Sequence, residues 1–349
     1  MRAATIRDGE VFVAEHPDPE PGSGEVLVRV RAAGLNGADI HQRAGHYPAP
    51  PGSPQDIPGL ELAGEVAARG PGAERFAAGD RVMAVVGGGG QAELATVHER
   101  QLMPIPDRLS FAEGDRVMAI VGGGGQAELA TVHERQLIPI PDGLSFTEAG
   151  GVPEVFTTAH DALFTQAGLR PGERLLVQGA AGGVGTAGVQ LGATGGAHVT
   201  ATVRNADLRD GVAELGAHEV IDPEGFTERG PFDVILELVG GPNLAGDLQA
   251  LATSGRIVVI GIGGGAKAEL NLGAMMGKRA TVRASTLRPR PLEEKALTAR
   301  AMERHVLALF ERGALRVPVA ATYPLEAVAE AYERFTAGAK LGKIVLEMP

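Results

Sequence analysis

The 349-residue sequence predicts an α/β protein in which a β-rich part is joined to a doubly wound parallel sheet. Short apolar runs separated by Gly and Pro fill the first third of the chain, as in a barrel or sandwich. From Arg174 onward, strand-like and helix-like segments alternate at the spacing of a parallel sheet covered by helices on both faces. A glycine-rich turn joins the first of these strands to the first of these helices, which is typical of nucleotide-binding sheets.

In the β-rich part, Glu25–Ala33 alternates apolar and charged side chains, as a half-buried strand does. A short helix is expected at Gly37–Ala44. The stretch Tyr47–Pro58 contains five prolines and is expected to be a loop. Further strands are expected at Glu61–Ala68, Arg81–Val86, Ala92–Val97 and Leu102–Ile105, and the last three recur after Gly114.

Residues 79–113 and 114–148 form a tandem duplication of one 35-residue segment, and the two copies differ at only four positions. Two copies are too few for a solenoid. Without one copy the remaining 314 residues keep an unbroken order, so one copy is interpreted as part of the fold and the other as an insertion.

We expect the second copy to fill the barrel, because it runs directly into Pro153–Ala159. In addition, Asp142-Gly143 accepts a positive-φ turn that Asp107-Arg108 would resist. The first copy joins the upstream strand equally directly. The spare copy is expected to be poorly ordered in a monomer, or to add strands at an oligomer surface.

The alternating part predicts a central strand at Asp233–Val239, which is nearly all apolar. The expected strands are Arg174–Gln178, His198–Val203, Glu219–Asp222, Phe232–Val239, Arg256–Ile260 and Thr281–Ser285, and the expected helices are Val184–Leu191, Ala206–Leu215 and Pro242–Ala252.

Composition limits the classes of function. The net charge of −11 argues against a general nucleic-acid surface. The chain has no cysteine, which excludes disulfides and thiolate metal sites. The first residues lack the apolar run of a signal peptide, and no segment is apolar enough to span a membrane, so a cytoplasmic location is expected.

Gly179, Gly182 and Gly185 follow an expected strand and open an expected helix. This context predicts a dinucleotide site, because the helix N-terminus offers free N–H groups to a pyrophosphate. The alternative is tight packing of strand on helix without a ligand. At the end of the next strand, Arg204 stands where an NAD site usually has an acidic residue, and a guanidinium can pair with a 2′-phosphate. We therefore expect NADPH, the alternative being a solvated surface arginine.

Seven parts of the chain carry distinctive motifs: Leu35–Asp39 (LNGAD), His46–Pro51 (HYPAPP), Ile57–Gly64 (IPGLELAG), Pro153–Ala159 (PEVFTTA), Gly179–Gly185, Ser285–Arg288 (STLR) with Pro291–Ala296 (PLEEKA), and Gly342–Leu346 (GKIVL). Together they resemble the zinc-independent NAD(P)H:quinone oxidoreductase (zeta-crystallin-like) branch of the medium-chain dehydrogenase/reductase superfamily. The resemblance implies a GroES-like catalytic domain at 1–158 and 300–349, and a Rossmann-type nucleotide domain at 159–299.

Relatives with a catalytic zinc hold it through cysteine and histidine. In this chain the corresponding Gly-His-Glu reads Gly59-Leu60-Glu61, and no metal is expected. The resemblance implies that Asn36 and Tyr47 lie near the nicotinamide and the acceptor. Alternatively, Asn36 caps the following helix and Tyr47 packs in its Pro-rich loop.

The resemblance also implies the residues around the cofactor. Thr158 is expected at the start of a helix near the cofactor phosphate or nicotinamide, and Ser285, Thr286 and Leu287 are expected to close the cofactor cleft. Each glycine has the alternative explanation of turn geometry alone. The full expected set is Thr158, Gly182, Gly183, Val184, Arg204, Asn205, Val239, Gly240, Gly241, Gly261, Ile262, Gly263, Ser285, Thr286, Leu287 and Lys343.

The expected activity is metal-free hydride transfer from NADPH to a quinone or conjugated carbonyl. An enoyl-thioester or enone reductase is the nearest alternative. A nucleotide-binding protein without turnover, its active site spoiled by the duplication, is the alternative from another class. No nucleic-acid or membrane partner is expected, and the resemblance implies a homodimer.

Overall fold

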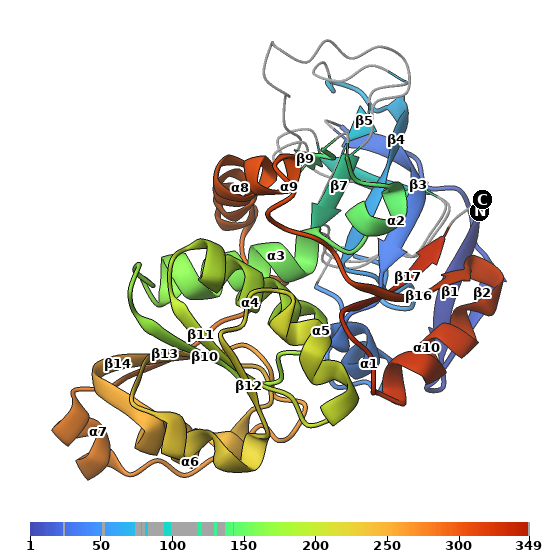
Figure 1. Cartoon of the computed structure of the whole chain (residues 1–349). Coiled ribbons are helices and arrows are strands. Elements are labelled where there is room, and N and C mark those ends of the chain that lie inside the picture. The colour runs from blue at the N-terminus through green and yellow to red at the C-terminus, as the bar shows by residue number, and fades with distance from the viewer. Residues whose placement is uncertain are drawn as a thin grey trace. The chain divides into compact units, whose positions relative to one another are not determined.

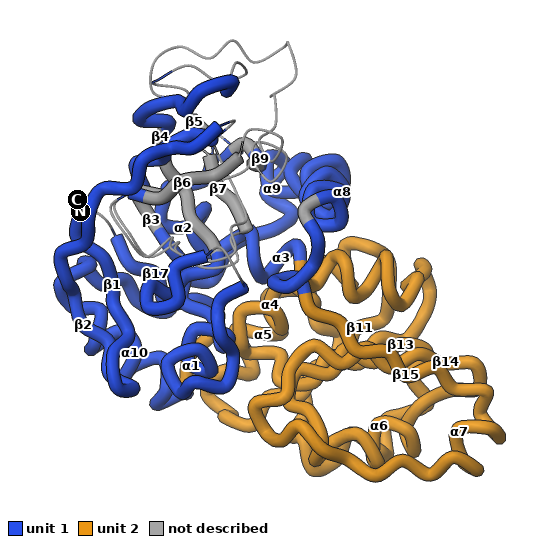
Figure 2. Tube along the Cα trace, turned by 180° about the vertical axis from the view of Figure 1, so that it is seen from behind, with its two compact units in different colours: residues 1–157, 287–338, 343–349 blue, residues 158–286, 339–342 orange. Residues whose placement is uncertain are grey.

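A computed structural model describes residues 1–23, 25–50, 53–73, 78, 81–82, 94–98, 117–120, 129–130, 137–141 and 143–347. These residues form two compact units, coloured in Figure 2. Unit 1 comprises Met1–Thr157, Leu287–Gly338 and Lys343–Pro349, and unit 2 comprises Thr158–Thr286 and Ala339–Gly342.

The sequence predicted a nucleotide domain that ends at residue 299. In the structure, the long segment of unit 2 ends at Thr286. Helix α8 (Leu292–Met302) belongs to unit 1 because it continues through a π-helical turn, Glu303–Leu307, into α9 (Ala308–Glu311). In unit 1, Phe310 of α9 packs edge-on against Phe156, with ring centroids 4.8 Å apart.

Unit 2 contains a six-stranded parallel sheet in the order β12-β11-β10-β13-β14-β15, which confirms the doubly wound prediction. The chain starts in the middle at β10, moves outward through α4 and α5, and returns to β13 to build the other half. Right-handed crossovers then put α4 and α5 on one face and α6 on the other (Figure 1). The strands are β10 (Arg174–Val177), β11 (His198–Thr202), β12 (Glu219–Ile221), β13 (Phe232–Glu237), β14 (Leu251–Val259) and β15 (Thr281–Ala284), and the helices are α4 (Gly183–Thr194), α5 (Arg209–Ala213), α6 (Leu244–Ala250) and α7 (Leu272–Lys278).

The core of unit 2 explains the sheet order. The central strand β13 is almost fully buried, and Phe232 and Ile235 pack with Leu176 of β10, Ile257 of β14 and Leu248 of α6. Burial of such side chains stabilises the fold by about 1.5–3 kcal/mol each. Two elements of unit 2 differ most from the prediction: β14 begins at Leu251 rather than Arg256, and the expected helix 206–215 is a 3₁₀ turn followed by α5.

Unit 1 contains nine described strands in one sheet, with β16-β17-β3-β4-β7-β9 as its continuous path and β5, β6 and β8 at its sides. A separate hairpin is formed by β1 (Arg2–Arg7) and β2 (Glu10–Glu15). The sheet strands are β3 (Glu25–Gly34), β4 (Glu61–Arg69), β5 (Arg81–Val82), β6 (Ala95–His98), β7 (Val117–Ile120), β8 (Leu129–Ala130), β9 (Leu137–Pro139), β16 (Val319–Pro324) and β17 (Lys343–Glu347), and the remaining helices are α1 (Gly37–Arg43), α2 (Phe146–Ala149), α3 (Pro153–His160) and α10 (Val328–Thr336).

Both copies of the duplicated segment contribute strands to this sheet. The first copy supplies β5, which pairs with β4, and β6, which pairs with β3. The second copy supplies β7 and β8, which pair with the same two strands, and β9 beside β7. The prediction that the second copy alone fills the barrel is therefore wrong for the described residues. Gly143 also lacks the positive φ on which that prediction partly rested, and Asp107, Arg108 and Asp142 lie outside the described residues.

The two copies pair in the same register. Ala95 and Ala130 occupy equivalent positions in the copies, and both pair with Val28 of β3. Val82 pairs with Gly64 of β4, and Met118 pairs with the adjacent Ala63, so Val117, the equivalent of Val82, is in register with Gly64. Equivalent residues of the two copies therefore pair with the same residues of β3 and β4, and the sheet contains strands from both copies.

Candidate functional site

The glycine-rich turn after β10 has a different cause at each glycine. Gly179 adopts φ +68°, which favours glycine. At Gly185 a Cβ would lie 2.6 Å from both Cα of Ala180 and the carbonyl oxygen of Gly179, so α4 could not approach the strand end with any side chain there. Backbone conformation therefore accounts for Gly179, and tight packing of the helix on the strand end accounts for Gly185.

Gly182 is different, because the fold itself does not require a glycine there. It is the N-cap of α4 with an ordinary φ of −74°, and a Cβ would meet its nearest neighbour, the Gly179 carbonyl oxygen, at 3.6 Å. The first N–H groups of a helix, here from Gly183 and Val184 onward, have no partner within the helix. The open space at Gly182 therefore borders a set of donors suited to a phosphate.

A segment from the far end of the chain lies beside this turn within unit 2. Gly342 donates its backbone N–H to the carbonyl of Ala181, at 2.8 Å, and forms a parallel bridge with Gly182. The resemblance indicated the stretch Gly342–Leu346, but the sequence alone did not pair it with the glycine turn.

The turns after β13 and β14 form the next part of the predicted cofactor site. Gly240 has φ +110°, and a Cβ there would lie 2.6 Å from the carbonyl oxygen of Gly265. Gly241 and Gly261 are equally crowded by backbone, at 2.2 Å from Lys267 and 2.1 Å from Leu238. Gly263 has nothing within 4 Å, and the neighbouring Ile262 is half exposed. Gly263 thus joins Gly182 as a glycine that local packing does not explain.

Glu237, which had no assigned role, holds the turn that contains Val239. Its Oε1 accepts the backbone N–H groups of Val239 and, at 2.7 Å, of Gly240. Its Oε2 accepts the side-chain amide of Asn243, at 3.1 Å. This role was not predicted, because Glu237 lies in a stretch that the sequence analysis interpreted as a nearly all-apolar strand.

Two arginines that follow β11 have different surroundings. Arg204 is exposed, and its guanidinium has no hydrogen bond or ion pair with any described residue. Arg209 is bound to the carbonyl of Val203, at 3.0 Å, and to the carboxylate of Asp222, at 2.6 Å. Between them, Asn205 uses its side-chain oxygen to cap a 3₁₀ turn by accepting the N–H of Asp207.

The expectation that Thr158 opens a helix is wrong. Thr158 is buried near the end of α3, which begins at Pro153 and continues into a π-helical turn, Asp161–Gln166. Beyond β15, the Ser285 N–H donates to the carbonyl of Val259, Thr286 is exposed and Leu287 is buried.

In unit 1, Asn36 is the N-cap of α1 and also belongs to a buried polar cluster. Its side-chain oxygen accepts the ammonium of Lys343, at 2.9 Å, and the same ammonium donates to the carbonyl of Leu35, at 2.7 Å. The carboxyl of Asp39 accepts the N–H of Asn36 at 2.8 Å and that of Gly59 at 3.1 Å. Burial raises the pKa of Asp39 to about 6, against the lowering effects of these N–H groups and of the charges on Arg288 and Lys343.

Tyr47 is half-buried and lies under a buried arginine. The Arg288 guanidinium carbon is 5.0 Å from the centroid of the Tyr47 ring, a cation–π distance. The guanidinium also donates to the Tyr47 carbonyl, at 3.4 Å, and to the side-chain oxygen of Gln42, at 2.7 Å. Asp39, Gln42 and Arg288 were not among the predicted site residues, although Asp39 and Arg288 lie inside the motifs LNGAD and STLR.

The described residues offer no donor set for a metal. They contain no group of three His, Cys, Asp or Glu side chains that could hold an ion, and the whole chain lacks cysteine. The residues present therefore do not fit the cysteine–histidine zinc site of related dehydrogenases. In addition, none of the helices within the described ranges has the length and apolarity needed to cross a bilayer.

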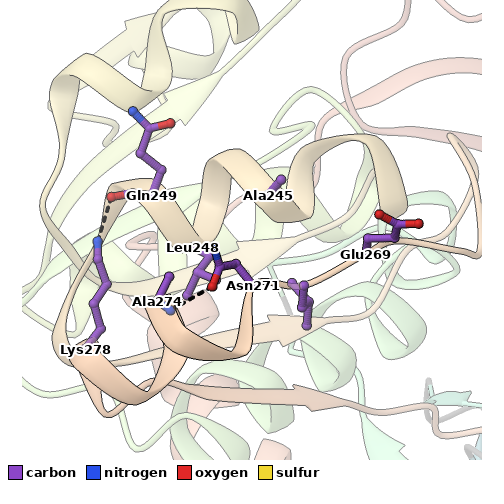
Figure 3. Close-up of a pocket in the computed structure, with 8 residues that line it drawn as sticks. Ala245, Leu248, Gln249, Glu269, Asn271, Ala274 and Lys278 are labelled. Atoms are coloured by element: carbon purple, nitrogen blue, oxygen red, sulfur yellow. Dashed lines mark hydrogen bonds between the residues drawn. The ribbon is translucent and has the colours of Figure 1, made fainter.

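A pocket of about 750 Å³ opens between α6 and α7 of unit 2 (Figure 3). Lys278, on its wall, donates to the backbone carbonyls of Gln249 and Leu251 at the end of α6. None of the residues that line it belongs to the predicted site; they are Ala245, Leu248, Gln249, Glu269, Leu270, Asn271, Ala274 and Lys278.

Comparison with known proteins places the chain. The family model of the alcohol dehydrogenase GroES-like domain matches residues 22–107, and that of the zinc-binding dehydrogenase matches residues 215–346. A quinone oxidoreductase of Rattus norvegicus is 30% identical over 339 residues, covering 94% of this chain and 90% of that protein. The solved quinone oxidoreductase of Thermus thermophilus, determined also in complex with NADPH, is 30% identical with a TM-score of 0.78, covering 99% and 100% of the two chains. A solved NAD-dependent alcohol dehydrogenase is 29% identical with a TM-score of 0.77, covering both chains fully.

The GroES-like and doubly wound parts define a member of the medium-chain dehydrogenase/reductase superfamily. Within it, the chain belongs to the quinone oxidoreductase family and is an oxidoreductase, as the sequence predicted.

Proposed function

We propose that the protein is an NADPH-dependent quinone reductase that transfers hydride to a quinone or a conjugated carbonyl without a metal. The observation that carries this proposal is the open helix N-terminus at Gly182, where neither φ nor packing requires the glycine. Membership of the quinone oxidoreductase family supports the choice of acceptor.

The residues of unit 2 would hold the cofactor by its phosphates. The N–H groups at the start of α4 suit the pyrophosphate, and the unpaired Arg204 suits a 2′-phosphate. Gly263 leaves room beside the turn after β14. The bound cofactor supplies the hydride.

The residues of unit 1 would orient the acceptor. Lys343 fixes the Asn36 side chain by binding its oxygen, which directs the amide nitrogen away from the ammonium. Arg288 fixes Tyr47 by the cation–π contact and by its bond to the Tyr47 carbonyl. A quinone gains negative charge on oxygen as hydride arrives, so positioned N–H and O–H donors stabilise the transition state without a metal.

The test is oxidation of NADPH by a simple naphthoquinone, followed by its absorbance, with and without prior treatment with a chelator. We expect turnover that the chelator does not change. Activity with an enoyl thioester but not with quinones would instead identify an enoyl reductase. Tight NADPH binding without any turnover would favour the non-catalytic alternative.

The acceptor side is tested in the same assay with Tyr47→Phe, which keeps the ring under Arg288. If the phenol donates to the developing oxyanion, kcat falls by roughly 10²-fold. An unchanged kcat, with a higher KM in Tyr47→Ala, would show that the ring only stacks on the acceptor.

A further inference from the structure

A buried polar network in unit 2 connects the turns that follow three neighbouring strands. Gln178, directly after β10, donates its side-chain amide to Asp247 Oδ1 of α6, at 2.9 Å. Its side-chain oxygen accepts the hydroxyl of Thr202, the last residue of β11, at 2.7 Å. The Thr202 oxygen in turn accepts the N–H of Gly179, at 3.1 Å, and so reaches the glycine turn.

The same network extends to the turn after β13. Asp247 interacts with the carboxyl of Glu237, and Glu237 binds the N–H groups of Val239 and Gly240. Glu237 and Asp247 are both 0% exposed. One chain of contacts therefore joins the turns at Gly179 and Gly240, both of which belong to the proposed cofactor site.

Two buried carboxylates that interact would repel each other strongly unless one carries a proton. The geometry indicates which one does. Glu237 accepts three N–H donors, whereas Asp247 Oδ2 is buried with no hydrogen-bond partner in the described structure. A proton on Asp247 turns that unsatisfied acceptor into a donor toward Glu237. Burial, and next the charge of Glu237, raise the pKa of Asp247 well above its usual range.

Among the described residues, the elements packed against α6 do not compete for this proton. Gln178 from β10 is neutral, and η4 (the 3₁₀ segment Pro223–Arg229) and β14 contribute Phe226 and Leu251 to the apolar core that also contains Leu248 of α6. The charged Lys278 of α7 is bound to the backbone carbonyls of Gln249 and Leu251. Glu237 of β13 is the ionisable group that interacts with Asp247 among the described residues.

We propose that Asp247 and Glu237 share one buried proton, and that this proton-linked pair is the positioning element that sets the Gly179 and Gly240 turns for dinucleotide binding. The part that concerns dinucleotide rests on the proposed function. The shared proton rests on the contacts of unit 2 alone.

The first test is stability against pH, which does not depend on any ligand. An unfolded Asp titrates near pH 3.9, whereas the folded Asp247 keeps its proton far above that value. Between the two pKa values the folded state binds one more proton, so stability falls as pH rises, by roughly tenfold in the unfolding constant per pH unit. Asp247→Asn can donate to Glu237 without titrating. The melting temperature of Asp247→Asn, relative to that of the wild type at the same pH, should therefore rise by roughly 2–4 °C per pH unit from pH 5 to pH 8.

The second test is the dissociation constant of NADPH, measured by its fluorescence from pH 7 to pH 10.5. Loss of the proton in the wild type should weaken binding by roughly tenfold at the alkaline end, while Asp247→Asn changes less than about twofold. Asp247→Leu should bind weakly at every pH, because it removes the hydrogen bond from the Gln178 amide and the interaction with Glu237. Glu237→Gln removes the charge that helps to raise the pKa of Asp247, so its melting temperature should fall less with rising pH than that of the wild type, and it serves as a second variant should Asp247→Asn fail to fold. Asp210→Asn, an exposed position on α5, is the matched control and should follow the wild type.

Three results separate the claims. Parallel melting curves of the wild type and Asp247→Asn across pH 5–8 would overturn the shared proton. The positioning role would be overturned if the wild type and Asp247→Asn lost affinity for NADPH equally at alkaline pH. Weak NADPH binding by Asp247→Asn at pH 7 would also overturn it. A wild type that binds no NADPH, but still shows the pH-dependent difference in melting temperature, would refute the proposed function and the positioning role while leaving the shared proton established.

Discussion

At the scale of single residues, Gly182 and Gly185 lie three positions apart in one turn and lack a side chain for different physical reasons. Gly185 is enclosed by the backbone of Gly179 and Ala180, whereas Gly182 faces space that the fold leaves open. The sequence cannot distinguish a glycine required by packing from one that borders open space, because both positions are simply glycine in the motif. The distinction appears only when the distances to neighbouring atoms are known.

The two glycines provide a matched pair of variants. Gly185→Ala should destabilise the protein by about 2–4 kcal/mol, because the backbone that it meets cannot move aside cheaply. Gly182→Ala should leave the melting temperature unchanged but weaken NADPH binding by roughly tenfold, because the methyl group occupies the place of the phosphate. Melting curves and NADPH fluorescence titrations measure both effects. A comparable loss of stability in the two variants would show that Gly182 is also structural.

Arg204 and Arg209 form a second matched pair. Arg204→Ala should raise the KM for NADPH by roughly tenfold and leave that for NADH nearly unchanged, because only NADPH carries the 2′-phosphate. Arg209→Ala breaks bonds to Val203 and Asp222 and should affect both cofactors alike through stability. Steady-state kinetics with each cofactor decide the matter. A wild type that prefers NADH, or equal effects of Arg204→Ala on both, would contradict this reading of Arg204.

The partners of Tyr47 could not be predicted, since Arg288 lies 241 positions away in the chain. Glu237 and Asp247 are close in the sequence, but they meet only because α6 packs back against β13. Local patterns indicate the residue types at a site, whereas the contacts that fix their orientation depend on how the chain folds.

At the scale of elements, apolar runs located the strands of unit 2 well. β10, β11, β12, β13 and β15 each lie within their expected ranges, because a buried parallel strand must be apolar along its length. The extra residues at the start of β14 were missed, as Ser254 and Gly255 do not read as strand. In unit 1 the sequence indicated the strands of each copy. It could not indicate which copy pairs with β3 and β4, because the two copies are almost identical.

Because the copies pair in one register, either one should suffice. Deletion of 79–113 and deletion of 114–148 should each give a soluble protein with a melting temperature at least that of the wild type. Deletion of 79–148 removes β5 to β9 together and should not fold. Soluble yield, melting curves and NADPH binding of the three variants test this. If one single deletion folds and the other does not, the copies have distinct structural roles.

At the scale of the whole molecule, the sequence predicted both fold classes in chain order, and the comparisons confirm the family. The unit boundaries depend on longer contacts. Residues 339–342 belong with unit 2 because Gly342 binds the glycine turn, whereas Lys343 belongs with unit 1 because it binds Leu35 and Asn36. A change of partner between two consecutive residues has no signature in composition or periodicity.

The identical register of Ala95 and Ala130 opposite Val28 also bears on how this chain tolerates mutation. A harmful substitution in one copy leaves an intact sequence that can take the same place, so selection acts weakly on each copy separately. Val28 has no such substitute, and a damaging change there affects both pairings at once. We expect a substitution scan to find positions 95 and 130 permissive and position 28 intolerant, and equal intolerance at all three would show that the copies cannot replace each other.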